Sequence, residues 1–399
     1  MKKFIKYIIL IPLALLLQSC AEDDFDYTES LLLNPEEMDI VTSINQLGCE
    51  ITKQSYWLDG NTLFSPICMQ QTLACLYNSA ELETKDDLAA LMNLTITDQD
   101  QLNNNFKRLL EKYESADQEA GISLYNKIIT SNQHPIRETF INISEYFYDI
   151  EMEYMDYANE SSLDSINTWI KNSSNNNIDK GFEVLPKDNI ILLNGINMQI
   201  EWNYAFSDAT DHETFYMSKT DSTQLKFMSA RNAFRSYETS YYHYIELPLK
   251  NNNYSMVLVI PKLMTGVDVT IKSFTAENLN KWEAEATEKD ITLVLPNTKI
   301  ALLNDMKKHL QEAGVNLFNS DAKFTGISED QLYISEYKTF SSFSLNKKGA
   351  LLPDSYQAKE SENEDVIIAN KPFIISLREN TTNCMFLSGI FKNPNNLKI

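Results

Sequence analysis

The sequence predicts an α+β fold in which a helix-rich N-terminal half packs on large mixed or antiparallel β-sheets. Amphipathic helical patterns fill much of residues 34–171, whereas strand patterns dominate from residue 189 to the C-terminus. The two kinds of pattern do not alternate as they would in a protein built from βαβ units. Near the C-terminus a polar segment of about twenty residues separates two apolar strand patterns, and a loop of that length in a compact domain usually has a function.

Residues 1–19 are expected to be a lipoprotein signal peptide. A basic start over residues 1–6 precedes an apolar run, residues 8–17, that is too short to span a bilayer comfortably. Leu17-Gln18-Ser19-Cys20 resembles a lipobox, so cleavage before Cys20 would leave a thiol for lipid attachment and a membrane anchor. The alternative is a plain secretory signal with an incidental cysteine.

Residues 20–33 are expected to be an acidic tether. Glu22-Asp23-Asp24 resembles the tag that exports some lipoproteins to the cell surface, although an acidic linker also simply stays solvated. We therefore expect an outer-membrane lipoprotein that is exposed on the cell surface. The sequence leaves open which face of the outer membrane carries the anchor.

Residues 34–399 are expected to form a single domain, because no Pro/Gly/Ser-rich break divides them. An apolar content of 43% suffices for a sizeable core, and a net charge of −22 repels nucleic acid. We expect a monomer without cofactor or bound metal.

The expected elements follow in order along the chain. Helices are predicted after Asn34-Pro35 and after Ser65-Pro66, where Ser65 is a helix cap, and then over residues 85–94, 102–113, 162–171 and 306–313. Strands are predicted over residues 189–197, 214–217, 241–249, 254–260, 290–295, 332–345, 366–377 and 384–391.

Four cysteines follow Cys20. Cys68 and Cys75 lie seven residues apart in a helical pattern, about 10 Å along one face, which is beyond disulfide reach. Both are expected to be buried thiols. Whether Cys49 and Cys384 pair cannot be decided from the sequence.

An ordered series of motifs resembles the serpin family over about residues 34–394. No single motif is specific, but their order and spacing are. The series comprises Asn61-Thr62-Leu63-Phe64-Ser65-Pro66, Ile166-Asn167 with Trp169, Leu193-Asn194 with Trp202 and Phe206, Glu246-Leu247-Pro248, Gly314 with Phe318, Ala322, Phe324 and Gly326, Asn370-Lys371-Pro372-Phe373, and Gly389 to Asn393-Pro394.

The resemblance implies a protease inhibitor that acts as a suicide substrate and has no catalytic group of its own. A serine or cysteine protease cleaves the exposed loop and becomes esterified to it, and the loop then inserts as a new strand of the main sheet. The region where that sheet opens would include Ser65, Asn194, Trp202 and Thr339. Thr339 stands where many inhibitory serpins carry a histidine.

The hinge implied by the resemblance is Gly349, Ala350, Leu351, Leu352 and Pro353, and this chain departs from the family there. Lys347-Lys348 replaces an acidic pair, and Leu351 to Tyr356 replaces a run of small residues. Pro353 cannot donate to a central ladder, and burying Asp354 unpaired would cost several kcal/mol. The alternative is therefore a non-inhibitory serpin that acts as a surface binding or decoy protein.

The bait bond lies in an acidic neighbourhood. Counting from the hinge points near Asn363, and counting back from Asn370 points near Ser361. Candidates are Lys359, Glu360, Ser361, Glu362, Asn363 and Glu364. A protease that prefers acidic residues fits this segment, as does one that recognises Lys359. A solvated charge run without a partner is the alternative.

Other function classes find little support. No nucleophile elbow, zinc-protease motif or phosphate-binding loop is present, and the four histidines are scattered. A surface nutrient-binding lipoprotein remains a third class that the anchor alone would permit. The target protease stays open.

Overall fold

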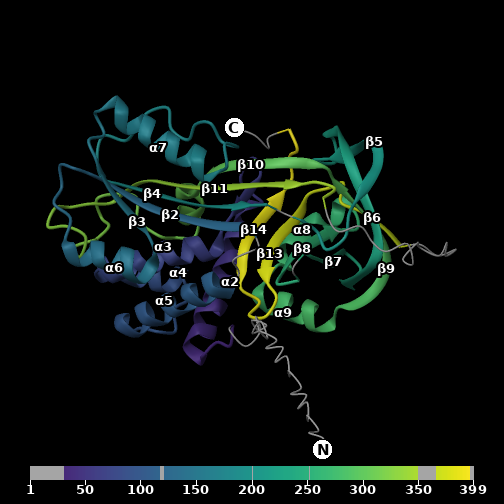
Figure 1. Cartoon of the computed structure of the whole chain (residues 1–399), viewed down its shortest axis with the longest axis horizontal. Coiled ribbons are helices and arrows are strands. Elements are labelled where there is room, and N and C mark those ends of the chain that lie inside the picture. Colours follow the sequence, from purple (N-terminus) through teal and green to yellow (C-terminus); the bar gives the residue numbers. More distant parts are fainter. Residues whose placement is uncertain (1–30, 117–120, 200, 251, 349–364, 396–399) are drawn as a thin grey trace, which may run out of the picture.

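The computed structural model describes residues 31–116, 121–199, 201–250, 252–348 and 365–395. The expected signal peptide, Cys20 and residues 349–364, which carry the hinge and bait candidates, lie outside this part of the chain. Two β-sheets and the helices around them make up the described part, which confirms the predicted α+β class (Figure 1). No helix in these ranges is long and apolar enough to cross a membrane.

The smaller sheet has five strands in the order β10-β11-β4-β2-β3. Within it β4 and β11 pair in parallel, as do β2 and β3, whereas the β10–β11 and β2–β4 pairs are antiparallel. The strand bounds are β2 Ile122–Ser131, β3 Glu151–Met155, β4 Ile190–Met198, β10 Thr298–Asp305 and β11 Ile334–Leu345.

The larger sheet has nine strands. Eight follow the order β1-β14-β13-β8-β7-β6-β9-β12, and β5 pairs with β6. The bounds are β1 Thr62–Phe64, β5 Ser207–Tyr216, β6 Ser222–Glu238, β7 Tyr242–Pro248, β8 Tyr254–Pro261, β9 Thr287–Pro296, β12 Asp365–Ile368, β13 Phe373–Glu379 and β14 Met385–Phe391.

The helices cluster mainly in the N-terminal half, as predicted. Asn34 caps α2 in a capping box with Glu37, and Ser65 caps α3 by accepting from the Cys68 N–H. The helices are α2 Pro35–Ser55, α3 Pro66–Ser79, α4 Leu82–Leu91, α5 Gln99–Ala116, α6 Glu138–Tyr148, α7 Glu160–Ser173, α8 Val267–Lys272, α9 Ala276–Glu285 and α10 Met306–Glu312, and Met264–Gly266 is a 3₁₀ turn.

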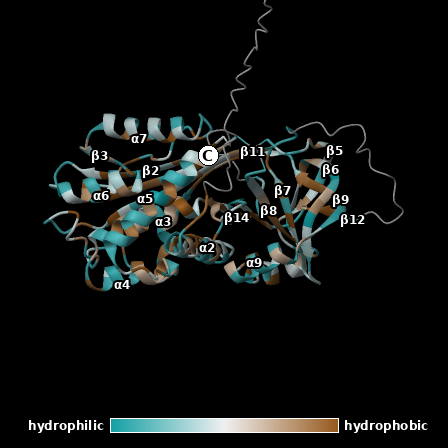
Figure 2. Cartoon of the chain, turned by 60° about the horizontal axis from the view of Figure 1, so that its bottom comes forward, coloured by the Kyte–Doolittle hydropathy of each residue, from teal (hydrophilic) through white to brown (hydrophobic). Residues whose placement is uncertain are grey.

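The five-stranded sheet is covered on both faces. Helix α7 lies on one face, and α3, α5 and α6 lie on the opposite side (Figure 2). Ile166 and Ile170 of α7 pack against a cluster that includes Ile191, Leu193 and Phe340 of the sheet. The other face joins the main hydrophobic core of the molecule. A strand in the middle of this sheet is therefore buried from both sides.

Several elements differ from the sequence prediction. The predicted strand over residues 366–377 is wrong: β12 and β13 are separate strands that pair with different neighbours, β9 and β8, and Pro372 between them has no N–H for a ladder. Strands β1, β2, β3, β6 and β10 and helices α6, α8 and α9 had not been predicted.

The thiols agree with the prediction. Cys68 and Cys75 are buried, and Cys49 and Cys384 are also buried and free, so those two do not pair. Burial raises the pKa of Cys68 to about 11 and that of Cys384 to about 12, which makes these thiols poor nucleophiles.

Candidate functional site

The candidate site is the seam between β4 and β11, the two strands that pair in parallel near the middle of the five-stranded sheet. Their register runs from Ile190 opposite Ile334 to Asn197 opposite Ser342. Strand β11 leads through residues 346–348 into residues 349–364, and the chain re-enters the described structure at β12, which belongs to the other sheet (Figure 2). The seam and the start of the loop are therefore contiguous.

The exit of β11 is tied to the chain that follows β4. The indole N–H of Trp202 donates to the Asn346 carbonyl at 2.7 Å, and the Trp202 backbone N–H donates to the Lys348 carbonyl at 3.1 Å. Lys347 pairs with Asp208 at 2.6 Å. These contacts fix the direction in which the chain leaves the sheet, up to the last described residue before the loop.

Buried polar atoms without partners lie beneath the seam. Asn194 and Thr339 face each other in the register, and Asn194 Nδ2 donates to the Tyr337 hydroxyl at 2.7 Å. Within the described residues, Asn194 Oδ1, Thr339 Oγ1 and Ser341 Oγ have no hydrogen-bond partner, although all three side chains are buried. Burying each such atom without a partner costs about 1–3 kcal/mol of stability, because the atom loses its hydrogen bonds to water.

The first turn of α3 supports the seam from below. Ser65, fully buried, caps this helix, and the Cys68 thiol lies 3.7 Å from the Gly195 carbonyl of β4. A Cβ on Gly195 would collide with the ring of Phe340 in β11. The glycine is therefore needed because Phe340 crosses the seam at this point.

A segment that follows α7 covers the other face of the seam. Asn177 Nδ2 donates to Ser342 Oγ at 2.6 Å, and that hydroxyl donates to the Ser174 carbonyl at 3.0 Å. Lys338 Nζ donates to the Gly181 carbonyl at 3.0 Å. These side-chain bonds tie β11 to its cover but do not cross to β4.

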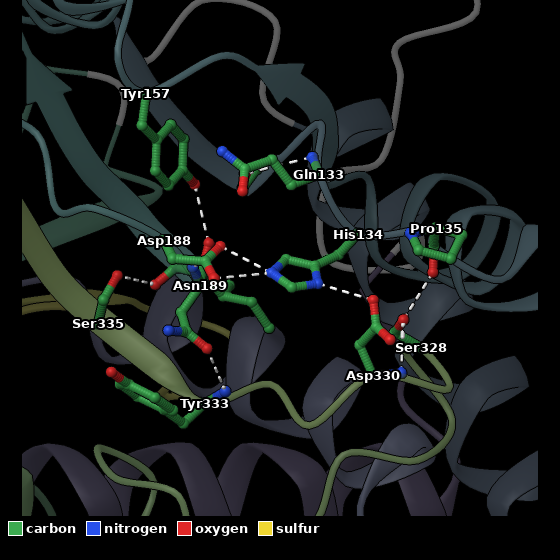
Figure 3. A network of polar contacts seen from close by, with 12 residues as sticks. Gln133, His134, Pro135, Tyr157, Asp188, Asn189, Ser328, Asp330, Tyr333 and Ser335 are labelled. Carbon is green, nitrogen blue, oxygen red and sulfur yellow. Dashed lines mark hydrogen bonds and ion pairs between the residues drawn. The ribbon is translucent and has the colours of Figure 1, made fainter.

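A histidine bridges the approaches to the two strands at the base of the seam (Figure 3). His134 Nε2 lies 2.7 Å from Asp188, which precedes β4, and Nδ1 lies 2.8 Å from Asp330, which precedes β11. Burial alone would lower the pKa of His134, but its hydrogen bonds to both carboxylates raise it. The lowered pKa of Asp188 has the same cause, since its bonds to His134 and to the Asn189 N–H outweigh its burial.

The structure brings together the predicted sheet-opening residues. Asn194 and Thr339 are register partners, Trp202 holds the exit of β11, and Ser65 caps the helix against β4. Lys338 and the His134 bridge had not been predicted. Among the described residues, no group of three His, Cys, Asp or Glu side chains could hold a metal ion.

Comparisons with known proteins agree with this architecture. A family model described as "Serpin (serine protease inhibitor)" matches residues 42–394. An uncharacterized serpin-like protein of Methanosarcina acetivorans is 26% identical over 372 residues, 84% of this chain and 82% of the relative. Human antithrombin-III is 27% identical over 360 residues, 84% of this chain and 76% of the relative.

Solved structures show the same fold at low sequence identity. A crystal structure of mouse protein-Z dependent protease inhibitor superposes with a TM-score of 0.80 at 20% identity, covering 92% of this chain and 98% of that one. Native protease nexin-1 with heparin gives a TM-score of 0.77 at 20% identity, covering 89% and 100%. Because the family model matches residues 42–394, most of the chain, the chain belongs to the serpin family.

Proposed function

We propose that this protein inhibits a serine or cysteine protease as a suicide substrate, without catalytic groups of its own, and is cleaved within residues 349–364. The observation that carries the proposal is the parallel seam. A strand that leaves β11 and turns back between β11 and β4 runs antiparallel to both of them. It can therefore form regular ladders on each side without reversing either neighbour.

The length of the seam matches the length of the segment that would insert, residues 350–358. An inserted strand opposite Ile334 to Ser342 needs about nine residues, or roughly 30 Å of extended chain. Residues 350–358 supply that length and begin four residues after the chain contacts Trp202 through Asn346. The unpaired atoms of Asn194, Thr339 and Ser341 favour a rearrangement of the seam, because the present arrangement leaves them unsatisfied.

The second candidate is a non-inhibitory serpin that serves as a surface binding or decoy protein. The observation that favours it is the hinge sequence Leu351-Leu352-Pro353-Asp354. Pro353 removes one ladder hydrogen bond, and Asp354 requires either a partner or protonation once it is buried. Slow insertion would release the cleaved protein from the protease before trapping.

A panel of secreted serine and cysteine proteases distinguishes the two candidates. The panel includes enzymes that cleave after glutamate and after lysine, because Lys359, Glu360, Glu362 and Glu364 are bait candidates. An inhibitor gives a complex with active protease that survives SDS and is absent with active-site-blocked protease. Clean cleavage by every enzyme, with complexes appearing only for the Pro353→Ala/Asp354→Ala variant, identifies the non-inhibitory candidate.

We also propose that the mature protein is a monomer anchored in the outer membrane through lipid on Cys20 and exposed at the cell surface. The lipobox-like sequence and the acidic residues after it support this proposal. Incorporation of a fatty-acid label that is abolished by Cys20→Ser, together with digestion of the protein on intact cells, tests it. A label that persists in Cys20→Ser contradicts the anchor.

A further inference from the structure

One edge of the five-stranded sheet is only half covered. Strand β3 pairs with residues 127–131 of β2, whereas β4 pairs with β2 along residues 122–130 on the opposite side. Among the described residues no strand pairs with residues 122–126 on the β3 side. The burial of β2 changes at the same place, because residues 122–125 are partly exposed and residues 126–131 are buried. We name residues 122–126 the open edge.

Hollows border the open edge. One, of about 700 Å³, lies between β2, α5 and α6, and its apolar lining includes Leu124, Tyr146 and Phe386. The second, of about 390 Å³, reaches the opposite face of β2, where Tyr125 and Trp169 line it. Because alternate residues of a strand point to opposite faces, a strand added to this edge would direct successive side chains into the two hollows.

Acidic side chains surround both hollows. The larger hollow is lined by Glu111, Glu114, Glu145 and Asp149, and Glu145 and Asp149 also line the smaller one. Among the described residues that line the two hollows, Lys107 is the one basic residue, and its amino group already lies 3.1 Å from Glu111. Burial raises the pKa of Asp149, the nearby charge of Glu114 raises it further, and Lys107 offsets these effects only in part.

We propose that the open edge binds an extended, basic segment of a partner protein by strand addition. Main-chain hydrogen bonds to residues 122–126 would hold the segment, with an apolar side chain in the larger hollow and lysine or arginine near Glu114 and Asp149. Five residues, roughly 17 Å, form a strand of ordinary length. A second copy of this chain fits poorly, since its net charge is −22 and its segment 359–365 is acidic.

The test uses the full mature chain and a fluorescein-labelled peptide that alternates lysine with tyrosine, valine and leucine. A second peptide of the same sequence carries N-methyl groups on alternate residues, so that it keeps its charge but cannot complete a ladder. We expect the first peptide to bind and to slow amide hydrogen exchange at residues 122–126. We expect the N-methylated peptide not to bind.

Variants test whether binding depends on the acidic residues beside the open edge or only on the overall negative charge of the protein. Glu114→Gln/Asp149→Asn should weaken binding about tenfold, which corresponds to ~1.4 kcal/mol shared between the two lost charge contacts. The control Glu277→Gln, an exposed acid on α9, should leave binding unchanged. Equal binding of the N-methylated peptide, unchanged exchange at residues 122–126, or equal loss in Glu277→Gln would each overturn the proposal.

Discussion

Replacing Thr339 by valine should stabilise the protein. Thr339 is fully buried beneath the seam, and its hydroxyl has no partner among the described residues. Valine has nearly the same shape, so the substitution removes an unsatisfied polar atom without creating a cavity. Recovering that desolvation cost should stabilise the intact form by about 1–3 kcal/mol. At roughly 1–2 °C per kcal/mol for a domain of this size, the Tm should rise by about 1–6 °C.

Thr52→Val is the matched control for this prediction. Thr52 is equally buried, but its Oγ1 lies 2.7 Å from the Ser388 hydroxyl, which is itself fully buried. The same substitution there leaves Ser388 without this partner and should lower the stability by about 1–3 kcal/mol. Differential scanning calorimetry of the uncleaved proteins measures both changes. If Thr339→Val melts below wild type, as Thr52→Val should, the hydroxyl beneath the seam is satisfied and the reasoning is wrong.

Three further predictions concern the base, middle and top of the seam. The pKa of His134 is raised in the folded protein, so its bridge stabilises the fold fully below about pH 6.5, and this stabilisation is lost as the pH rises through the folded-state pKa. The pKa of Asp188 is lowered, so the stabilisation that Asp188 contributes is lost as the pH falls below about 4. The Tm difference between wild type and His134→Asn should therefore be largest near pH 5–6 and smaller at pH 8, and a pH-independent difference would contradict the bridge. Gly195→Ala should destabilise the intact form by about 1–3 kcal/mol, because the added Cβ would collide with the Phe340 ring. An unchanged Tm would show that β4 and β11 can move apart at this point without cost. Trp202→Phe should cost about 1–3 kcal/mol by leaving the Asn346 carbonyl without its indole donor, and faster hydrogen exchange at residues 346–348 should accompany the loss.

The sequence predicted the fold class because that depends on spaced landmarks. The residues it proposed for the sheet opening lie around one seam of the structure, and their role in opening the sheet stays a prediction. Three strands of the five-stranded sheet, β2, β3 and β10, escaped prediction. In β2 the polar pair Asn126-Lys127 interrupts the apolar pattern, and only the fold reveals that Lys127 is neutralised by Glu151 and Glu153. The local pattern therefore could not distinguish a buried strand from a loop.

The His134 bridge could not have been found from the sequence. Its histidine lies 54 and 196 residues from its two carboxylate partners, and no local motif links the three. The open edge of β2 was equally hidden, because it depends on where β3 starts to pair. The bridge arises where three loops meet, and the open edge arises from strand register; the chain specifies both only through tertiary packing.

A disulfide across the seam tests most directly whether β4 and β11 separate. Leu193 and Lys338 are register partners, and neighbouring strands lie about 4.8 Å apart, within the range that a disulfide spans. Leu193→Cys/Lys338→Cys would be made with Cys20→Ser; the native thiols that remain are buried and have raised pKa values.

The protein would be nicked between Lys359 and Glu364 and its Tm compared before and after. Strand insertion at the seam predicts that nicking raises the Tm of the reduced protein, by at least about 4 °C if about eight new ladder hydrogen bonds contribute ~0.5–1.5 kcal/mol each. It predicts no rise for the oxidised protein. A rise of equal size in the oxidised protein, or none in either state, would contradict strand insertion at this seam.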